Sequence, residues 1–508
     1  MLRRFLLGAL AAAVLSACGD DRSPARSTPT PPATPTATAT ATAPPTASRT
    51  PTDTATPTAT STREPSPSPT ASATPVATET AAPTATAAPD CAAVGTICTV
   101  AGTGMAQFDG DGRPALQTSL YFPIDVLFDR AGRLLIMDWN NLRLRRVNDD
   151  GTVQTVMGSD IEDFPVDGAL ASESPLHHAS NMEYDAPGNL YIAGDHVPVA
   201  FRVGTDDRVF TVAGTTEYGY AGDGGPAREA ELSTPFGVLP DAAGGLYISD
   251  VDAHVIRYVD ASGIIHTAAG TGEKGYAGDG GPATAALLAG PSRLQFGPDG
   301  DLYFCEIKNH VVRRLRRDGT IDTVIGTGER GYAGDGGPAT AAQLDTPYDV
   351  QFAPNGDLYV ADTGNNVVRR VDGAGVISTV AGDGEPRFAG DGGPASTCSL
   401  RRPSALFLDG EGSLWIADTS NHRVRKVERF LDAAPGRRCW FNQDRTARQR
   451  HGRSHRGNGA HGQRPGRRGC RLGTCGRRGP ACSARTVDRR PDFRAPFDFR
   501  VSADRLGR

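Results

Sequence analysis

Six residues recur at a spacing of 56 and include side chains that could form a ligand site. The position is occupied in turn by Asp125, Asn181, Gly237, Arg293, Asp349 and Ala405. The oxygens of Asp125, Asn181 and Asp349 are ligands of the kind that Ca²⁺ takes in proteins, and Arg293 is a candidate for binding. The sequence therefore suggests a binding site with calcium as a possible cofactor, or a solvated surface without chemistry if these side chains do not converge.

Two histidines precede the second member of this set. Either His177 or His178 could act as a general base. Trp139, a large aromatic residue in a loop, is a further binding candidate, and the irregular segment that starts at Asp195 could add to a partner surface. The sequence contains no Gly-x-Ser-x-Gly, His-Glu-x-x-His or Walker pattern. We therefore expect binding rather than catalysis.

These positions belong to a repeat with a single period. The segment Gly-Tyr-Ala-Gly-Asp-Gly-Gly-Pro-Ala occurs at 219–227, 275–283 and 331–339, and its Asp recurs every 56 residues from Asp111 to Asp391. Each unit has short alternating segments separated by Gly, Asp, Asn and Pro, which predicts four strands. Six units predict an all-β fold, a six-bladed β-propeller, with the candidate residues at the mouth of its channel.

The glycine-rich segment itself has three interpretations. It could cradle a phosphate, hold calcium or connect two blades. It is not followed by the Lys and Ser/Thr of a phosphate loop or by the ligands of an EF-hand. We interpret it as the connection between blades, with a calcium role for its Asp as the alternative.

The ends of the repeat predict how the ring closes. A segment like the fourth strand of a unit lies at 97–102, ahead of the first full unit, and the last unit ends after three strands at Val427. The early segment should complete the sixth blade and leave no exposed sheet edge. In an exported protein a Cys91–Cys98 disulfide would pin this strand, with Cys98–Cys398 as the alternative.

An acid and an arginine seven residues apart recur in five units. The pairs are Asp138 and Arg145, Asp250 and Arg257, Glu306 and Arg313, Asp362 and Arg369, and Asp418 and Arg425. The second unit has Gly194 and Phe201 instead, so both charges are lost together. Because one unpaired buried charge costs more than the loss of both, we predict structural ion pairs across adjacent strands rather than a ligand-binding ring.

Two segments carry a family resemblance. Residues 358–371, LYVADTGNNVVRRV, and residues 414–427, LWIADTSNHRVRKV, resemble the NHL repeat, and the resemblance extends over all six units. It implies a propeller that is a binding platform in most settings and an enzyme in a few. Gluconolactonase-like propellers are similar in architecture, which implies the alternative of a metal-dependent hydrolase or lactonase with a divalent ion at the channel mouth.

The N-terminal part of the chain has the features of an exported lipoprotein. Residues 1–17 combine Arg3 and Arg4 with a short apolar run, which is typical of a signal peptide. The ending Leu-Ser-Ala-Cys resembles a bacterial lipobox, which implies lipidation of Cys18. Residues 18–90 are rich in Thr, Pro, Ala and Ser, a composition that predicts a disordered stalk.

The charge distribution separates the propeller, assigned to residues 91–431, from the C-terminal segment. Residues 432–508 contain 20 Arg and 6 Asp without Lys or Glu, a net charge of +14, whereas the whole chain carries −5. This segment could be a frame-shifted translation, a disordered polyanion-binding tail or a small cysteine domain. We expect no nucleic acid partner for the propeller. The sequence predicts a lipoprotein of the bacterial cell envelope, held at the membrane through Cys18, that displays a protein- or glycan-binding module.

Overall fold

The structure, a computed structural model, describes residues 91–432. The predicted signal peptide, the lipidation site Cys18, the stalk and, from residue 433, the Arg-rich tail lie outside the described residues. None of the helices within 91–432 has the length and apolar character needed to cross a membrane.

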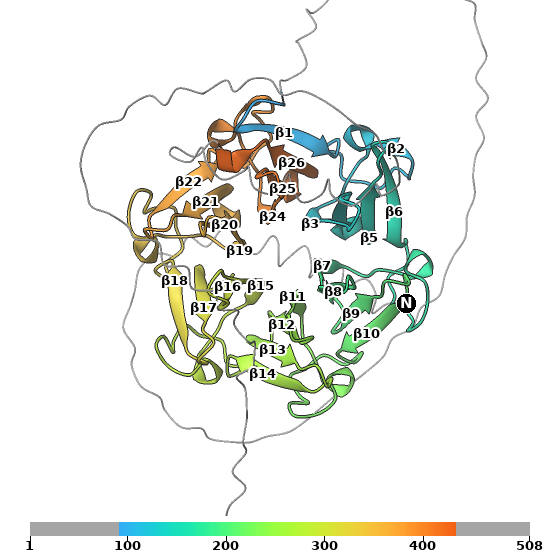
Figure 1. Ribbon diagram of the computed structural model, residues 1–508, viewed down its shortest axis with the longest axis vertical. Coiled ribbons are helices and arrows are strands. Elements are labelled where there is room, and N and C mark those ends of the chain that lie inside the picture. Colours follow the sequence, from blue (N-terminus) through green and yellow to red (C-terminus); the bar gives the residue numbers. More distant parts are fainter. Residues whose placement is uncertain (1–90, 433–508) are drawn as a thin grey trace, which may run out of the picture. The chain divides into compact units, whose positions relative to one another are not determined.

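Residues 91–432 form six antiparallel sheets around a central axis, each with four main strands (Figure 1). This confirms the predicted six-bladed β-propeller. The inner strands are β3 (Pro123–Phe128), β7 (Ala179–Tyr184), β11 (Pro235–Pro240), β15 (Pro291–Phe296), β19 (Pro347–Phe352) and β24 (Pro403–Leu408). Proline, which has no N–H to donate, is acceptable at the first residue of a strand, and it begins five of these six.

The other strands follow outward in each blade. The second strands are β4 (Leu134–Asp138), β8 (Leu190–Gly194), β12 (Leu246–Asp250), β16 (Leu302–Glu306), β20 (Leu358–Asp362) and β25 (Leu414–Asp418). The third strands are β5 (Arg143–Val147), β9 (Ala200–Val203), β13 (Val255–Val259), β17 (Val311–Leu315), β21 (Val367–Val371) and β26 (Arg423–Val427). The outer strands are β6 (Thr152–Gly158), β10 (Val209–Ala213), β14 (Ile265–Ala269), β18 (Ile321–Ile325), β22 (Ile377–Ala381) and β1 (Thr96–Ala101).

Short elements occupy the connections. Two-residue strands join the outer edges of the first and sixth blades: β2 (Arg113–Pro114) and β23 (Gly393–Pro394). Single 3₁₀ turns precede inner strands at η1 (Ala115–Gln117), η3 (Ala171–Glu173), η4 (Ala227–Glu229), η5 (Ala283–Ala285), η6 (Ala339–Ala341) and η8 (Ala395–Thr397). Others lie at η2 (Trp139–Asn141), η7 (Thr363–Asn365), η9 (Thr419–Asn421) and η10 (Phe430–Asp432).

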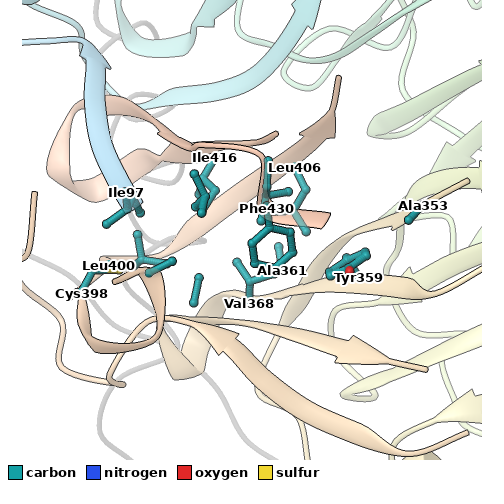
Figure 2. Close-up of a cluster of buried hydrophobic side chains, with 14 residues drawn as sticks. Ile97, Ala353, Tyr359, Ala361, Val368, Cys398, Leu400, Leu406, Ile416 and Phe430 are labelled. Carbon is teal, nitrogen blue, oxygen red and sulfur yellow. The ribbon is translucent and has the colours of Figure 1, made fainter. Parts of the chain in front are cut away.

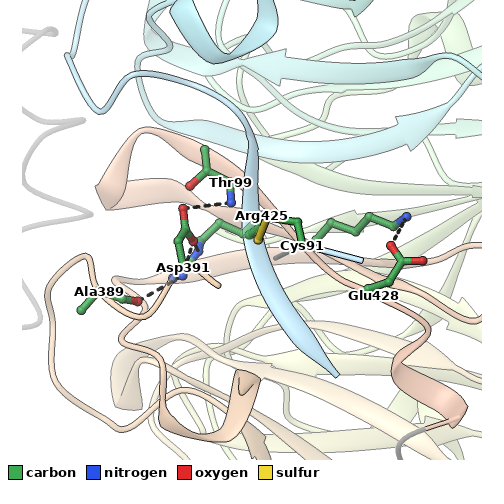
Figure 3. The surroundings of a disulfide bond; sticks show 8 residues. Cys91, Thr99, Ala389, Asp391, Arg425 and Glu428 are labelled. Atoms are coloured by element: carbon green, nitrogen blue, oxygen red, sulfur yellow. Dashed lines mark hydrogen bonds and ion pairs between the residues drawn. A yellow bond between two sulfur atoms is a disulfide. The ribbon is translucent and has the colours of Figure 1, made fainter. Parts of the chain in front are cut away.

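The N-terminal strand closes the ring as predicted. β1 pairs antiparallel with β26, with Ile97 opposite Val427 and Thr99 opposite Arg425. Figure 3 shows this junction, where the Asp391 carboxylate accepts the Thr99 N–H and binds Arg425. The disulfide joins Cys91 to Cys98, as first predicted, and Cys398 is a buried free thiol. Strands from both ends of the propeller therefore share one blade.

The apolar core lies between adjacent blades. Figure 2 shows one such cluster, in which Leu406 and Ile416 of the sixth blade pack with Ala361 and Val368 of the fifth. Ile97 of β1 is a fully buried member of the same cluster. Burial of apolar surface stabilises by roughly 25 cal/mol per Å², so the closing strand contributes both hydrogen bonds and core packing.

A left-handed residue after the second strand accepts a backbone hydrogen bond from the next blade; a long one joins the Gly290 N–H to His254 Nδ1 at 3.4 Å, and three shorter ones lie in the later blades. His310 Nδ1 accepts the Thr346 N–H at 3.0 Å, and His422 Nδ1 accepts the Phe122 N–H at 3.2 Å. In the intervening blade, Asn366 Oδ1 accepts the Arg402 N–H at 2.9 Å. A histidine can accept at Nδ1 only when that nitrogen carries no proton, so the two shorter bonds to histidine require a neutral Nδ1.

Replacing His310 and His422 with Asn should reduce the acid sensitivity of the propeller. Desolvation lowers the pKa of both imidazoles; for His310 the nearby Asp345 opposes this, and for His422 Arg401 reinforces it. A depressed pKa means that the unfolded chain takes up protons first, so these groups lose stability as pH falls below about 6.5. Each lost bond costs on the order of 1 kcal/mol.

The measurement is denaturant unfolding of wild type and the double variant at pH 7 and pH 5. We expect the wild type to lose more unfolding free energy across this interval, because Asn keeps the acceptor without titrating, as Asn366 already does. Equal losses in the two proteins would contradict this assignment.

Candidate functional site

The recurring set predicted from the sequence forms one row around the channel, called here the polar row. Its members come one from each inner strand: Asp125, Asn181, Gly237, Arg293, Asp349 and Ala405. The polar members are almost fully buried, with 2% of Asp125, 4% of Arg293 and 1% of Asp349 exposed. The expectation of a solvated channel mouth is therefore wrong, because the side chains bond to one another inside the ring.

Arg293 spans the channel. It belongs to the fourth blade, and its Nη1 binds Asp125 Oδ1 of the first blade at 2.5 Å. Its Nη2 donates to the carbonyl oxygens of Ile124 at 2.9 Å and Ser180 at 2.8 Å. One guanidinium thus links three blades. Two of these, the first and the fourth, lie on opposite sides of the six-bladed propeller.

The proposed calcium ligands are engaged by protein donors. Asp125 also accepts the N–H groups of Val126 and Met182, both at 2.8 Å, and the Asn181 amide at 3.1 Å. Asn181 Oδ1 accepts the Val238 N–H, and Asp349 Oδ2 accepts the Leu406 N–H. Among residues 91–432 no three His, Cys, Asp or Glu side chains are grouped to hold a metal ion. The polar row therefore does not fit a resident calcium ion.

A second row closes the channel toward the start of the inner strands. Phe236 of the third blade and Tyr348 of the fifth meet edge to face at 5.6 Å, although the fourth blade lies between them. The second, fourth and sixth blades have serine at this position, and Ser180 Oγ and Ser292 Oγ donate to the carbonyl oxygens of Phe236 and Tyr348 at 2.7 and 3.0 Å. Phe236 and Tyr348 are 5% and 6% exposed. This row separates the polar row from the loops before the inner strands.

A third row, two residues beyond the polar row, was missed by the sequence reasoning. It includes the partly exposed residues Glu183, Gln295, Gln351 and Phe407. Together with Asp349 and Arg293 they line a small axial cavity of about 20 Å³, which has room for about one water molecule. Alternation along a strand places residues i and i+2 on one face, so the signal was present in the sequence.

Burial perturbs the acids of this cavity. Desolvation raises the pKa of Glu183 to about 8, and the negative charge of Asp125 acts in the same direction while Arg293 opposes it. Desolvation raises the pKa of Asp349 to about 7, against the opposing effects of Arg293 and the Leu406 N–H. Arg293 is the single cation among the cavity-lining residues, which also include Asp125, Glu183 and Asp349.

The two candidate bases lie in a separate cluster between the first and second blades. The rings of His178 and His196 lie 4.4 and 5.5 Å from the Trp139 ring, and His177 lies 5.1 Å from His178. Trp139 is 4% exposed, so the interpretation of Trp139 as an exposed binding residue is wrong. Desolvation lowers the pKa of His178 to about 3, and the charges of neighbouring histidines act in the same direction.

Four of the five predicted acid and arginine pairs are direct ion pairs. The distances are 3.3 Å for Asp138 and Arg145, 2.9 Å for Glu306 and Arg313, 3.2 Å for Asp362 and Arg369, and 3.6 Å for Asp418 and Arg425. The third blade differs: Asp250 accepts the N–H groups of Ser233 and Thr234, and Arg257 binds Asp223 at 2.6 Å. Ala253 supplies an N–H to Asp250 where the paired blades have asparagine.

The Asp of the glycine-rich loop is a second partner of each arginine. Arg313 binds Asp279 at 2.6 Å, and Asp279 also accepts the Thr323 N–H of the outer strand. Equivalent ion pairs join Asp111, Asp223, Asp335 and Asp391 to Arg145, Arg257, Arg369 and Arg425. The arginine side chains are fully buried. The loop therefore anchors a blade edge, which leaves its carboxylate little capacity for calcium.

The same loops carry exposed aromatic rings, called here the aromatic set. The members recur with the 56-residue period and are 37–51% exposed: Phe108, Tyr220, Tyr276, Tyr332 and Phe388. Each ring lies over one of the buried arginines, with separations of 5.0–5.5 Å. The tyrosine hydroxyls bond to Thr267, Thr323 and Thr379. The rings are thus held in fixed orientations.

The aromatic set lies near the turns between second and third strands. Asn309 of such a turn donates to the Gly275 carbonyl oxygen, next to Tyr276, at 2.7 Å, and Asn365 bonds in the same way next to Tyr332. This end of the propeller is the end at which the inner strands begin. The cavity with Glu183 lies beyond the polar row, toward the other end.

Comparisons with known proteins support the fold alone. No family model matches the chain. It is 28% identical over 351 residues to Teneurin-4 from Mus musculus and 27% identical over 369 residues to Teneurin-m from Drosophila melanogaster. The matches cover 61% and 65% of this chain but 12% and 13% of the relatives, so the chain spans about one eighth of their length.

One solved structure of low sequence identity shares the fold, and a second matches less well. A Bacteroides thetaiotaomicron protein of unknown function matches with a TM-score of 0.50 and 17% identity, over 65% of this chain and 75% of that one. An auxiliary nutrient binding protein from the same species has a TM-score of 0.48 and 16% identity, with the same coverage of the two chains. At this level of sequence identity, the similarity is one of fold.

Proposed function

We propose that this protein is an NHL-type propeller of the bacterial cell envelope, anchored through a lipid on Cys18, that binds a protein or a glycan. The observation that carries the proposal is the aromatic set. Rings fixed in orientation and partly exposed lose little conformational entropy on binding, and aromatic residues are enriched in the energetic centres of interfaces. Mass measurement of the mature N-terminal peptide tests the anchor, since an unmodified N-terminus would contradict it.

The binding surface is the end of the propeller that carries the aromatic set. These loops also carry carboxylates, which are hydrogen-bond acceptors. A glutamate lies three residues before each of Tyr220, Tyr276, Tyr332 and Phe388 in the sequence. The same repeat around the axis would let one extended or branched ligand contact several blades. The alternative of a metal-dependent hydrolase or lactonase would require a metal ion to displace Arg293 from Asp125.

Changing Tyr220, Tyr276 and Tyr332 together to Ala should weaken ligand binding at least tenfold. The test applies the full chain, with Cys18→Ser to prevent lipidation, to a glycan array and to crosslinking on cells. The matched control is the triple Tyr→Phe variant, which keeps the rings, since Phe108 and Phe388 hold the equivalent positions in other blades. Binding that is unchanged in the Ala variant would overturn the surface, and the absence of any reproducible ligand would overturn the function.

A further inference from the structure

Two residues that follow the last strand pack between the fifth and sixth blades. The Phe430 ring lies 5.4 Å from the Tyr359 ring of the fifth blade and is 8% exposed (Figure 2). Leu431 packs against the same apolar cluster, and its N–H donates to the Gly412 carbonyl oxygen of the sixth blade at 3.0 Å. An aromatic and an aliphatic residue from outside the repeat therefore cover this junction, called here the filled site.

The next junction, between the sixth and first blades, has the same lining around an open cavity of about 290 Å³, called here the open groove. This volume is near the lower end of the range for ligand pockets, about 300–1,000 Å³. The 56-residue period, continued around the closed ring, relates the apolar lining of the two places. The related residues are Trp415 and Tyr359, Phe128 and Leu408, Leu134 and Leu414, Val147 and Val427, and Val100 and Val380.

The lining of the open groove is left exposed where the filled site is covered. Trp415 is partly exposed, whereas Tyr359 is 1% exposed. The valine at the end of the third strand is likewise partly exposed in the open groove and fully buried in the filled site. Gly132, which corresponds to Gly412, is exposed, and its carbonyl oxygen accepts no hydrogen bond from residues 91–432. The open groove therefore offers an apolar surface and a main-chain acceptor.

We propose that the open groove binds a segment of another protein in which an aromatic residue is followed by an aliphatic one. The ring would pack on Trp415, and the N–H of the aliphatic residue would donate to the Gly132 carbonyl oxygen, as Leu431 does to Gly412 in the filled site. Burial of both side chains removes apolar surface from water on the segment and on the groove. A second copy of this chain could not supply its Phe430 without emptying its own filled site.

The open groove is separate from the surface of the proposed function. Gly132 lies in the turn after the inner strand β3, so the groove is at the end where the inner strands finish. The aromatic set lies at the end where they begin. The inference does not rest on the proposed function, and variants of the two surfaces test them independently.

The test is fluorescence anisotropy of a labelled peptide with the sequence of residues 428–433, Glu-Arg-Phe-Leu-Asp-Ala, titrated with the full chain carrying Cys18→Ser. We expect saturable one-to-one binding, and at least tenfold weaker binding of a peptide with Ser in place of both Phe and Leu. Val100→Asp, which places a charge in the apolar lining, should also weaken binding at least tenfold. The matched control is Val380→Asp, the same change at the filled site, which should leave binding unchanged.

The inference would be overturned by any of four results. The first is the lack of saturable binding, and the second is equal binding of the Ser peptide. The third is a larger loss with Val380→Asp than with Val100→Asp, because the peptide would then be replacing Phe430. The fourth is binding only after Trp440 and Phe441 are changed to Ser, which would assign the open groove to this chain's own C-terminal segment. The Ser peptide probes the contact on otherwise unaltered protein, and denaturant unfolding shows whether each variant is folded.

Discussion

Arg293→Met should destabilise the propeller by about 3–5 kcal/mol, an effect expected when a buried ion pair loses one partner. The side chain is 5% exposed and binds Asp125, whose side chain is 3% exposed. Its loss would also leave the carbonyl oxygens of Ile124 and Ser180 without the guanidinium. Since these groups come from the first and second blades, the variant should also loosen the ring across its axis.

A double variant separates the lost pair from lost packing. In Asp125→Asn with Arg293→Met the unpaired charge is gone, so we expect the double variant to be more stable than Arg293→Met by about 2 kcal/mol. The control is Arg387→Met, which removes an ion pair with Asp383 in which the arginine side chain is 57% exposed, and exposed pairs contribute about 0–1 kcal/mol. Denaturant unfolding checks all three. A loss below 1 kcal/mol for Arg293→Met would refute the crossing contact as a structural element.

The fold was predictable because its information is periodic. One spacing counts the blades, and the unmatched strand at 97–102 shows how the ring closes. The structural ion pairs were predictable because acid and arginine are lost together: Gly194 and Phe201 replace both in one blade. A Cβ on Gly194 would lie 2.2 Å from Val197 Cγ2. In the second blade, the Val197 side chain therefore packs against the position where the other blades have the acid.

The side-chain partners of the candidate site were not predictable from spacing. Asp125 and Arg293 stand three repeats apart, and the repeat places them on opposite blades without stating that a long side chain reaches across. Burial of Trp139 depends on His178 and His196 of the irregular blade, for which the repeat offers no template. The second role of the loop Asp was hidden because Asp167 persists in the second blade, where it pairs with Arg228 instead.

Arg313→Phe should cost about 3–5 kcal/mol, because it leaves Glu306 buried without its cation. Arg313 is fully buried and also binds Asp279, beneath the Tyr276 ring. Adding Glu306→Gly recreates the Gly194 and Phe201 combination of the second blade, so the double variant should recover a large part of this loss. Arg314→Met, the next residue along β17, removes partly exposed ion pairs with Asp322 and should cost less than about 1 kcal/mol.

The pH dependence of Arg313→Phe gives an independent check on the same pair. Burial raises the pKa of Glu306 to about 7 in the wild type, and Arg313 opposes that rise. Without Arg313 the pKa should rise further, so the folded variant takes up a proton before the unfolded chain does. An acid with a raised pKa destabilises the fold above that pKa and recovers as pH falls toward its unfolded value. The unfolding free energy that Arg313→Phe loses relative to wild type should therefore be smaller at pH 5 than at pH 7.5. A loss that is equal or larger at pH 5 would mean that Arg313 stabilises the blade through packing and not through the charge of Glu306.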